Sequence, residues 1–224
     1  MVVSTAKCGD PDYMPKSEGA FKRGASNIQN WIVEGGEFPP EGDGRYHLFI
    51  NYACGWSHRC MIVRALKGLE ACVPMSHTGI VLTTSSSSGE YRGWPLPHDG
   101  TGNGFRDTRD VYNSKNPGYG AGTPTRQLSV PILFCTKTKK VVSNDSAQIC
   151  VMLDAAFEGV VASPRVPLYP EALRDDIEAV NAVVYPGLND GVYRTKFART
   201  DAAYEESADQ GGKRVIFSHL SRGS

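Results

Sequence analysis

Tyr46-His-Leu-Phe-Ile-Asn-Tyr-Ala-Cys54-Gly-Trp-Ser-His-Arg59 is the stretch of this chain that decides its fold. Residues 46–51 combine aromatic and branched side chains with alternating polarity, which predicts a β-strand. Residues 53–67 then place apolar side chains at helical spacing, and Gly68 is a natural stop for that helix. Cys54 is therefore expected where a strand gives way to a helix.

Three further segments complete an order of elements. Residues 79–84 predict a second strand, after which a Gly- and Pro-rich, helix-poor connection runs to about residue 124. Residues 130–135 and 141–142 form a hairpin pattern, and Asn144-Asp-Ser146 opens a helix. The order strand, helix, strand, hairpin, helix predicts an α/β fold with a thioredoxin-like N-terminal domain.

The sequence divides into an arm, a main domain and a helical region. Residues 1–44 predict a loosely structured arm, 45–160 the thioredoxin-like domain, 170–209 the start of an all-helical domain, and 210–224 a divergent tail. The helical region has one apolar stripe, formed by Leu173, Ile177, Val180 and Val184. Without further helices to cover it, this stripe would be exposed, which predicts oligomerisation or poor solubility.

The amino-acid composition argues against several classes of protein. The 24 basic residues balance the 24 acidic ones, which argues against binding to nucleic acid or to anionic membranes. We find no apolar run suited to a signal peptide or a membrane span, and therefore expect a soluble cytoplasmic protein. The six cysteines form no CxxC pair, so most are expected to be reduced, packed thiols.

Cys54 is the first candidate for chemistry. At the start of a helix its sulfur would face unpaired amide groups and the positive end of the helix dipole, and Arg59 could add positive charge. These features favour a thiolate, which is the nucleophile in thiol exchange. The alternative is a buried cysteine at the end of a strand.

A metal site or a disulfide at this place is less favoured. His58 and Cys60 follow Cys54, but six helical residues turn through about 240°, so the two sulfurs would point apart. We therefore expect a single reactive thiol and no metal, and we expect His58 to be a packed side chain and not a metal ligand.

Two later segments are suited to binding a peptide-like ligand. A proline at the start of a strand cannot donate to the sheet, and a cis Val130-Pro131 bond would leave the Val130 backbone free to pair with a ligand; an edge proline is the alternative. Asp145 and Ser146 at a helix N-terminus could hold an amino-acid-like amine and carboxylate, although simple helix capping is the alternative.

These residues together resemble one family. The stretch from Arg45 to Arg59 is similar to the active-site stretch of the glutathionyl-hydroquinone reductases, the xi class of glutathione transferases. Four later segments resemble signatures of the same family, in the same order: Gly93-Trp94, Ser129-Val-Pro-Ile-Leu133, Val142-Ser-Asn-Asp-Ser-Ala-Gln-Ile149 and Val184-Tyr-Pro-Gly-Leu-Asn-Asp-Gly-Val-Tyr193. The resemblance extends over roughly residues 27 to 208. It implies a thioredoxin-like domain followed by the start of a helical glutathione transferase C-terminal domain.

The resemblance implies glutathione as co-substrate and glutathionyl-hydroquinones as substrates. Cys54 would attack the glutathione sulfur, release the hydroquinone and remain as a mixed disulfide, which a second glutathione would resolve. The residues matching the family's glutathione contacts are Trp94, Arg126, Val130, Pro131, Asp145 and Ser146, with Arg126 displaced by one residue from the family's spacing. Tyr185 or Tyr193 falls where the family keeps a proton-donating tyrosine.

Three departures from the family limit the expected activity. Gly55 stands where the family usually has proline, Asp145 replaces a glutamate, and the chain leaves the family pattern after Ala208, before the helices that wall the hydroquinone pocket and carry the dimer-forming surface. A homodimer is therefore left open. Two alternatives to the reductase remain: a redox-sensing glutathione-binding remnant, and an omega-like thiol transferase.

Overall fold

The structure is a computed structural model that describes residues 19–23, 26, 28–84, 90–115, 119, 128–161 and 166–209. These residues form two compact units. The first unit spans the described residues between 26 and 168, and the second combines 19–23 with 169–209. Among the helices of the described part, none is long and apolar enough to cross a membrane.

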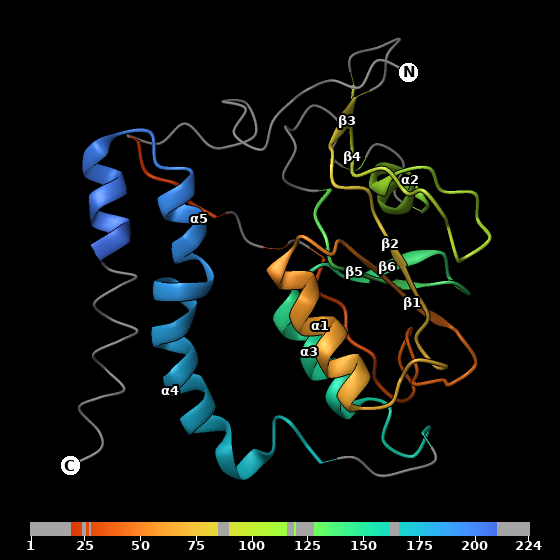
Figure 1. Cartoon of the computed structure of the whole chain (residues 1–224). Coiled ribbons are helices and arrows are strands. Elements are labelled where there is room, and N and C mark those ends of the chain that lie inside the picture. The colour runs from red at the N-terminus through yellow and green to blue at the C-terminus, as the bar shows by residue number, and fades with distance from the viewer. Residues whose placement is uncertain are drawn as a thin grey trace. The chain divides into compact units, whose positions relative to one another are not determined.

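The first unit is built on a mixed four-stranded sheet, in the order β2-β1-β5-β6. The strands are β1 (Tyr46–Ile50), β2 (Met75–His77), β5 (Ile132–Cys135) and β6 (Lys140–Ser143), with β1 and β2 parallel and the other pairs antiparallel. Helices α1 (Gly55–Leu66) and α3 (Ser146–Ala155) lie side by side (Figure 1). This arrangement confirms the α/β, thioredoxin-like plan.

Strand β1 is buried on both faces, because it is central in the sheet. Tyr46, Leu48 and Ile50 join one apolar cluster with residues of α1 and α3, whereas Phe49 joins a second cluster with residues of α2 (Thr108–Asn113). Alternation of side chains along the strand sends neighbours to opposite faces. The sheet therefore separates two cores, which we call the α1/α3 core and the α2 core.

The predicted strand over 79–84 is wrong in part. The strand parallel to β1 is β2, and Thr83–Thr84 instead forms β3, which pairs with β4 (Tyr91–Gly93) in a separate two-stranded ladder. An edge strand of three residues is too short for an alternation pattern, so its sequence carried little signal. The connection expected to be poor in helix contains α2, and the side chain of its N-cap Asp107 accepts from the Asp110 amide at 3.0 Å.

Residues 28–44 of the predicted arm contact the rest of the first unit. Gln29 bridges to Ser143, and the Asn30 amide donates to the Val142 carbonyl at 2.9 Å, so this segment lies against the edge of β6. Ile32 and Phe38 are buried in the α1/α3 core. An edge strand leaves backbone groups unpaired, and the arm satisfies some of them.

The second unit is helical. It contains η2 (Glu171–Leu173), α4 (Arg174–Val184), the π-helical turn η3 (Tyr185–Asn189), α5 (Gly191–Lys196) and a last helix over 201–209. Within α4 no residue is buried, and in the apolar stripe Leu173 and Val180 are 51% and 45% exposed. Among the described residues the stripe is therefore largely uncovered.

Candidate functional site

Cys54 lies at the N-cap of α1, as the sequence predicts. Its backbone is extended, its amide donates to the Asn51 carbonyl, and its carbonyl accepts from the His58 amide, both at 3.0 Å. The half-buried thiol packs against the α2 core, and its Sγ donates to the Val130 carbonyl at 3.7 Å. The amides of the first helical turn thus begin beside a thiol that is accessible to solvent.

Asn51 shapes the turn that holds Cys54, and sequence reasoning missed this role. Its Oδ1 accepts from the Ala53 amide at 2.8 Å, while its Nδ2 donates to Thr78 Oγ1 and the Gly79 carbonyl, both at 2.9 Å. The Asn51 amide in turn donates to Ser57 Oγ. A buried asparagine directly after a strand was the available signal, because such a residue needs several partners.

Arg59 binds α3. Its Nε donates to Ser146 Oγ at 3.1 Å, and its guanidinium lies 4.9 Å from the centre of the Trp56 ring. Ser146 is buried, so the hydrogen bond is shielded from water. The expected positive charge near the start of α1 is present, and it is anchored on the first residue of α3.

Asp145 caps α3, which was the alternative considered from the sequence. Its Oδ1 accepts from the amides of Ala147 at 2.8 Å and Gln148 at 3.3 Å, and its Oδ2 accepts from Gln29 Nε2 at 3.3 Å. Gln29 belongs to the N-terminal arm, and no local sequence pattern predicts its contact with Asp145. The carboxylate keeps acceptor capacity beyond its cap, so capping and ligand binding are compatible.

The Val130-Pro131 peptide bond is cis, which is one of the two alternatives that the sequence left open. It directly precedes β5, and the Val130 carbonyl faces the Cys54 thiol. Val130 itself is buried in the α2 core. The structure therefore brings Val130, Pro131 and Cys54 together at the end of the sheet where α1 begins.

Trp94 directly follows β4 (Tyr91–Gly93) and packs on the α2 core. It is half-buried and packs on the α2 core together with Cys54. Its amide donates to Thr108 Oγ1 at 3.0 Å, and its carbonyl accepts from the Thr108 amide at 2.9 Å. Thr108 Oγ1 also donates to the Leu128 carbonyl at 3.1 Å. Thr108 therefore joins the Trp94 segment to the segment that leads into Val130.

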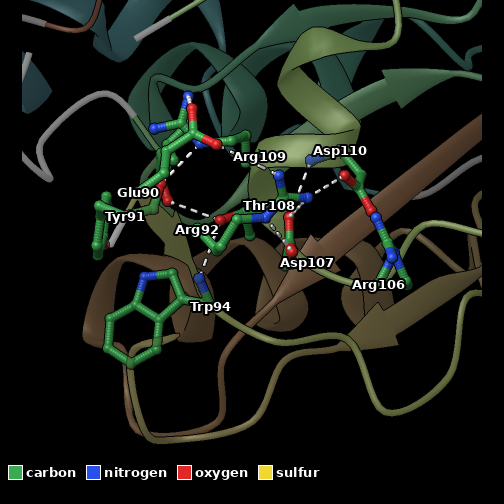
Figure 2. A network of polar contacts seen from close by, with 10 residues as sticks. Glu90, Tyr91, Arg92, Trp94, Arg106, Asp107, Thr108, Arg109 and Asp110 are labelled. Carbon is green, nitrogen blue, oxygen red and sulfur yellow. Dashed lines mark hydrogen bonds and ion pairs between the residues drawn. The ribbon is translucent and has the colours of Figure 1, made fainter. Parts of the chain in front are cut away.

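A charged network holds β4 on α2 (Figure 2). Arg92 binds the carboxylate of Asp107 at 2.8 Å and also that of Asp110, while Arg109 Nε donates to the Tyr91 carbonyl at 2.6 Å. Burial raises the pKa of the Asp107 carboxyl, and the hydrogen bond from Arg92 opposes that shift. The network fixes the backbone on which Trp94 stands.

The remaining predicted residues lie elsewhere. Tyr185 and Tyr193 belong to the second unit, and Arg126 lies outside the described residues. Tyr185 is exposed, whereas the Tyr193 ring lies 4.4 Å below the guanidinium of Arg23, which also pairs with Asp190. Proton donation by either tyrosine stays a prediction.

Metal binding has little support in the described part of the chain. There, no group of three or more His, Cys, Asp and Glu side chains is arranged to hold an ion. The thiols of Cys60 and Cys72 are buried among apolar side chains instead.

Comparison with known proteins adds the family context. The model described as "Glutathione S-transferase, N-terminal domain" matches residues 53–156. The chain is 36% identical over 214 residues to Glutathione S-transferase omega-like 2 of Schizosaccharomyces pombe, covering 92% of this chain and 63% of that protein. It is 38% identical over 204 residues to Glutathionyl-hydroquinone reductase PcpF of Sphingobium chlorophenolicum, covering 88% and 60%.

A solved structure agrees with these relatives. The Xi glutathione transferase ECM4 from Saccharomyces cerevisiae in complex with glutathione superposes with a TM-score of 0.76 at 26% identity, covering 91% of this chain and 65% of that one. The chain thus spans less than two thirds of the length of each of these proteins. Its residues 53–156 are similar to a glutathione S-transferase N-terminal domain, and glutathionyl-hydroquinone reductases and Xi-class transferases are among its homologues.

Proposed function

We propose that this homologue of the Xi-class glutathione transferases reduces S-glutathionyl-hydroquinones to hydroquinones, with glutathione as the reductant. The observation that carries the proposal is the Cys54 thiol, half-buried at the N-cap of α1 and 3.7 Å from the Val130 carbonyl. The relative PcpF bears the name of this activity, and the yeast Xi structure binds glutathione.

In the first step the Cys54 thiolate attacks the glutathione sulfur of the substrate. An S–S bond forms and the bond between sulfur and the aromatic carbon breaks, so the two sulfurs are oxidised and the ring is reduced. The ring carbon takes up a proton, for which Tyr185 and Tyr193 are the proposed donors. Hydroquinone leaves, and Cys54 remains joined to glutathione.

In the second step a free glutathione thiolate attacks the mixed disulfide. Oxidised glutathione leaves and the Cys54 thiolate is restored, which balances the reaction at two glutathione sulfurs oxidised per substrate reduced. Amides at the start of α1 favour the negative charge on the departing Cys54 sulfur. The same thiol position thus serves as nucleophile in one step and leaving group in the next.

The proposed glutathione contacts surround this thiol. The Val130 backbone beside Pro131 would pair with the cysteinyl part of glutathione, in the way that an extended peptide pairs with a strand. The α3 N-terminus, with Asp145 and Ser146, would hold the γ-glutamyl end, and Trp94 would cover the other side. Arg126 is proposed as a further contact, from the resemblance alone.

A thiol transferase of the omega type is the second candidate. One relative carries the name omega-like 2, and exchange on a glutathione mixed disulfide needs only the Cys54 site of the first unit. The polar groups proposed for glutathione also lie in that unit. This activity would leave Tyr185 and Tyr193 without a role.

The test is glutathione-dependent release of hydroquinone from a purified glutathionyl-hydroquinone, followed by chromatography. The wild-type chain is compared with Cys54→Ala and, as a matched control, with Cys72→Ala, which removes a buried thiol from the α1/α3 core. Turnover lost only in Cys54→Ala supports the reductase. Turnover on a small glutathione mixed disulfide alone selects the thiol transferase. A folded chain that only becomes glutathionylated at Cys54 would leave the redox-sensing alternative.

A further inference from the structure

Two cysteines that the proposed reaction does not use lie against each other. Cys60 on α1 and Cys150 on α3 have their sulfurs 3.8 Å apart, although 90 positions separate them in sequence. Cys60 is fully buried and its Sγ also contacts the Ser146 carbonyl at 3.6 Å. Cys150 is half-buried at the margin of the α1/α3 core. Among the described cysteines, these are the two whose sulfurs lie in contact.

We propose that Cys60 and Cys150 are a second redox site, which closes to an intramolecular disulfide when the chain meets a hydroperoxide. A disulfide bond is about 2.05 Å long, so the sulfurs must approach by roughly 2 Å. Side-chain rotation and a small shift between two adjacent helices can supply that movement. Cys54 lies at the N-cap of α1 and packs on the α2 core, so it is not a member of this pair.

The two thiols differ in solvent exposure, and we therefore infer different roles for them in the oxidation. Cys150 is partly exposed, and the hydrogen bond with Cys60, followed by the nearby charge of Arg59, lowers the pKa of its thiol. Burial raises the pKa of the Cys60 thiol, which disfavours its direct attack on an oxidant. Cys150 is therefore the thiol that meets the peroxide, and Cys60 is the thiol that resolves it.

The chemistry balances without any group from the chain beyond these two thiols. The Cys150 sulfur attacks one peroxide oxygen, the O–O bond breaks, and a sulfenic acid and one water molecule result. The Cys60 sulfur then attacks the Cys150 sulfur, an S–S bond forms, and the sulfenic oxygen leaves as a second water with the Cys60 proton. Two electrons pass from the thiols to hydrogen peroxide, and an added dithiol reverses the closure.

The disulfide would covalently join the two helices whose first turns form the candidate site. Helix α1 begins at Cys54 and carries Arg59, and α3 begins at Ser146, which Arg59 binds. A cross-link between Cys60 and Cys150 closes a long loop, and such a link stabilises the native state against the unfolded chain. Oxidation is therefore expected to raise the thermal midpoint.

The test uses the Cys54→Ser variant, so that the exposed thiol cannot react. The protein is treated with hydrogen peroxide, free thiols are alkylated, and digested peptides are mapped by mass spectrometry without reduction. We expect a cross-linked peptide pair containing Cys60 and Cys150, lighter by two hydrogen atoms than the separate peptides. The added Cys150→Ala change should abolish it, and an added Cys72→Ala change should leave it intact.

Thermal unfolding gives the second measurement. The oxidised protein should show a higher midpoint that dithiothreitol reverses, with no such change in Cys150→Ala. A folded, peroxide-treated chain in which Cys60 and Cys150 are still alkylated, or in which Cys150 proceeds to a sulfinic acid while Cys60 stays free, would overturn the proposal. These readouts do not depend on any reaction of glutathione.

Discussion

Trp94 and Thr108 are joined by a reciprocal pair of hydrogen bonds, with the Trp94 amide donating to Thr108 Oγ1 at 3.0 Å and the Thr108 amide donating to the Trp94 carbonyl at 2.9 Å. The Thr108 hydroxyl also donates to the Leu128 carbonyl, two residues before Val130. Gly93 is close enough that a Cβ there would lie 2.1 Å from this hydroxyl. Thr108 thus sets the spacing of two segments proposed to bind glutathione.

Replacing Thr108 with Val should therefore weaken glutathione binding more than it slows the chemistry. Losing the hydroxyl leaves a buried amide and a buried carbonyl without their partner, at a cost of about 1–3 kcal/mol. We expect the KM for glutathione to rise about tenfold with kcat changed less than about threefold. Steady-state kinetics on a folded variant checks this.

Thr108→Ser is the matched control, because it keeps the hydroxyl and removes only a methyl group. It should restore the KM to within about threefold of wild type. An equal loss of kcat in both variants, with no change in KM, would contradict a positioning role for the hydroxyl.

Replacing Gly55 with a residue that has a side chain is expected to stabilise the folded protein. Gly55 opens α1, and a Cβ there would meet no atom within 4 Å. Gly55→Ala should raise the free energy of unfolding by about 0.4–1 kcal/mol, because alanine restricts the unfolded chain. Gly44→Ala is the control: it also meets no atom within 4 Å, but its φ of +76° disfavours any side chain, so it should destabilise. Urea unfolding of both variants decides the matter.

The buried ion pair of Lys67 and Asp154 links α1 to α3 at 2.9 Å, with both side chains about as buried as the core. Asp154→Ala leaves the ammonium group uncompensated and should cost about 3–5 kcal/mol in unfolding free energy. Lys140 and Glu37 form an exposed ion pair at 2.6 Å. Glu37→Gln should therefore change the free energy of unfolding by less than about 1 kcal/mol. Similar losses in the two variants would refute the role of burial.

The burial of His47 leads us to expect that the folded protein loses stability in mild acid. The side chain is buried and bonded to Ser76 Oγ at 2.9 Å, and burial lowers its pKa to about 4 from the usual 6.5. Between these values the unfolded chain binds more protons than the native one, so stability is complete above about pH 6.5 and falls as the pH drops towards 4. The total loss is about 3 kcal/mol at most.

Urea unfolding between pH 4 and 7 tests the role of His47, with His47→Gln as the variant. The variant should be less stable near neutrality, yet its unfolding free energy should depend less on pH across this window. An unchanged slope in His47→Gln would assign the acid sensitivity to other groups.

Local patterns were sufficient for much of the site. The strand and helix around Cys54, the hairpin and the start of α3 were predictable, because each follows from a short run of residues. The cis bond before Pro131 was one of two alternatives that the sequence left open. Asp145 as a helix cap was among the alternatives for the same reason. Short β2 escaped prediction, since three residues show no periodicity.

The sequence by itself determined that Cys54 stands at a strand-to-helix junction, because neighbouring residues specify both elements. Only the tertiary structure decided which distant groups meet: Arg59 with Ser146, Gln29 with Asp145, and Cys60 with Cys150. These contacts join residues 87 to 116 positions apart. They depend on how α1, α3 and the arm pack against the sheet, and packing of distant segments leaves no periodic trace in either one.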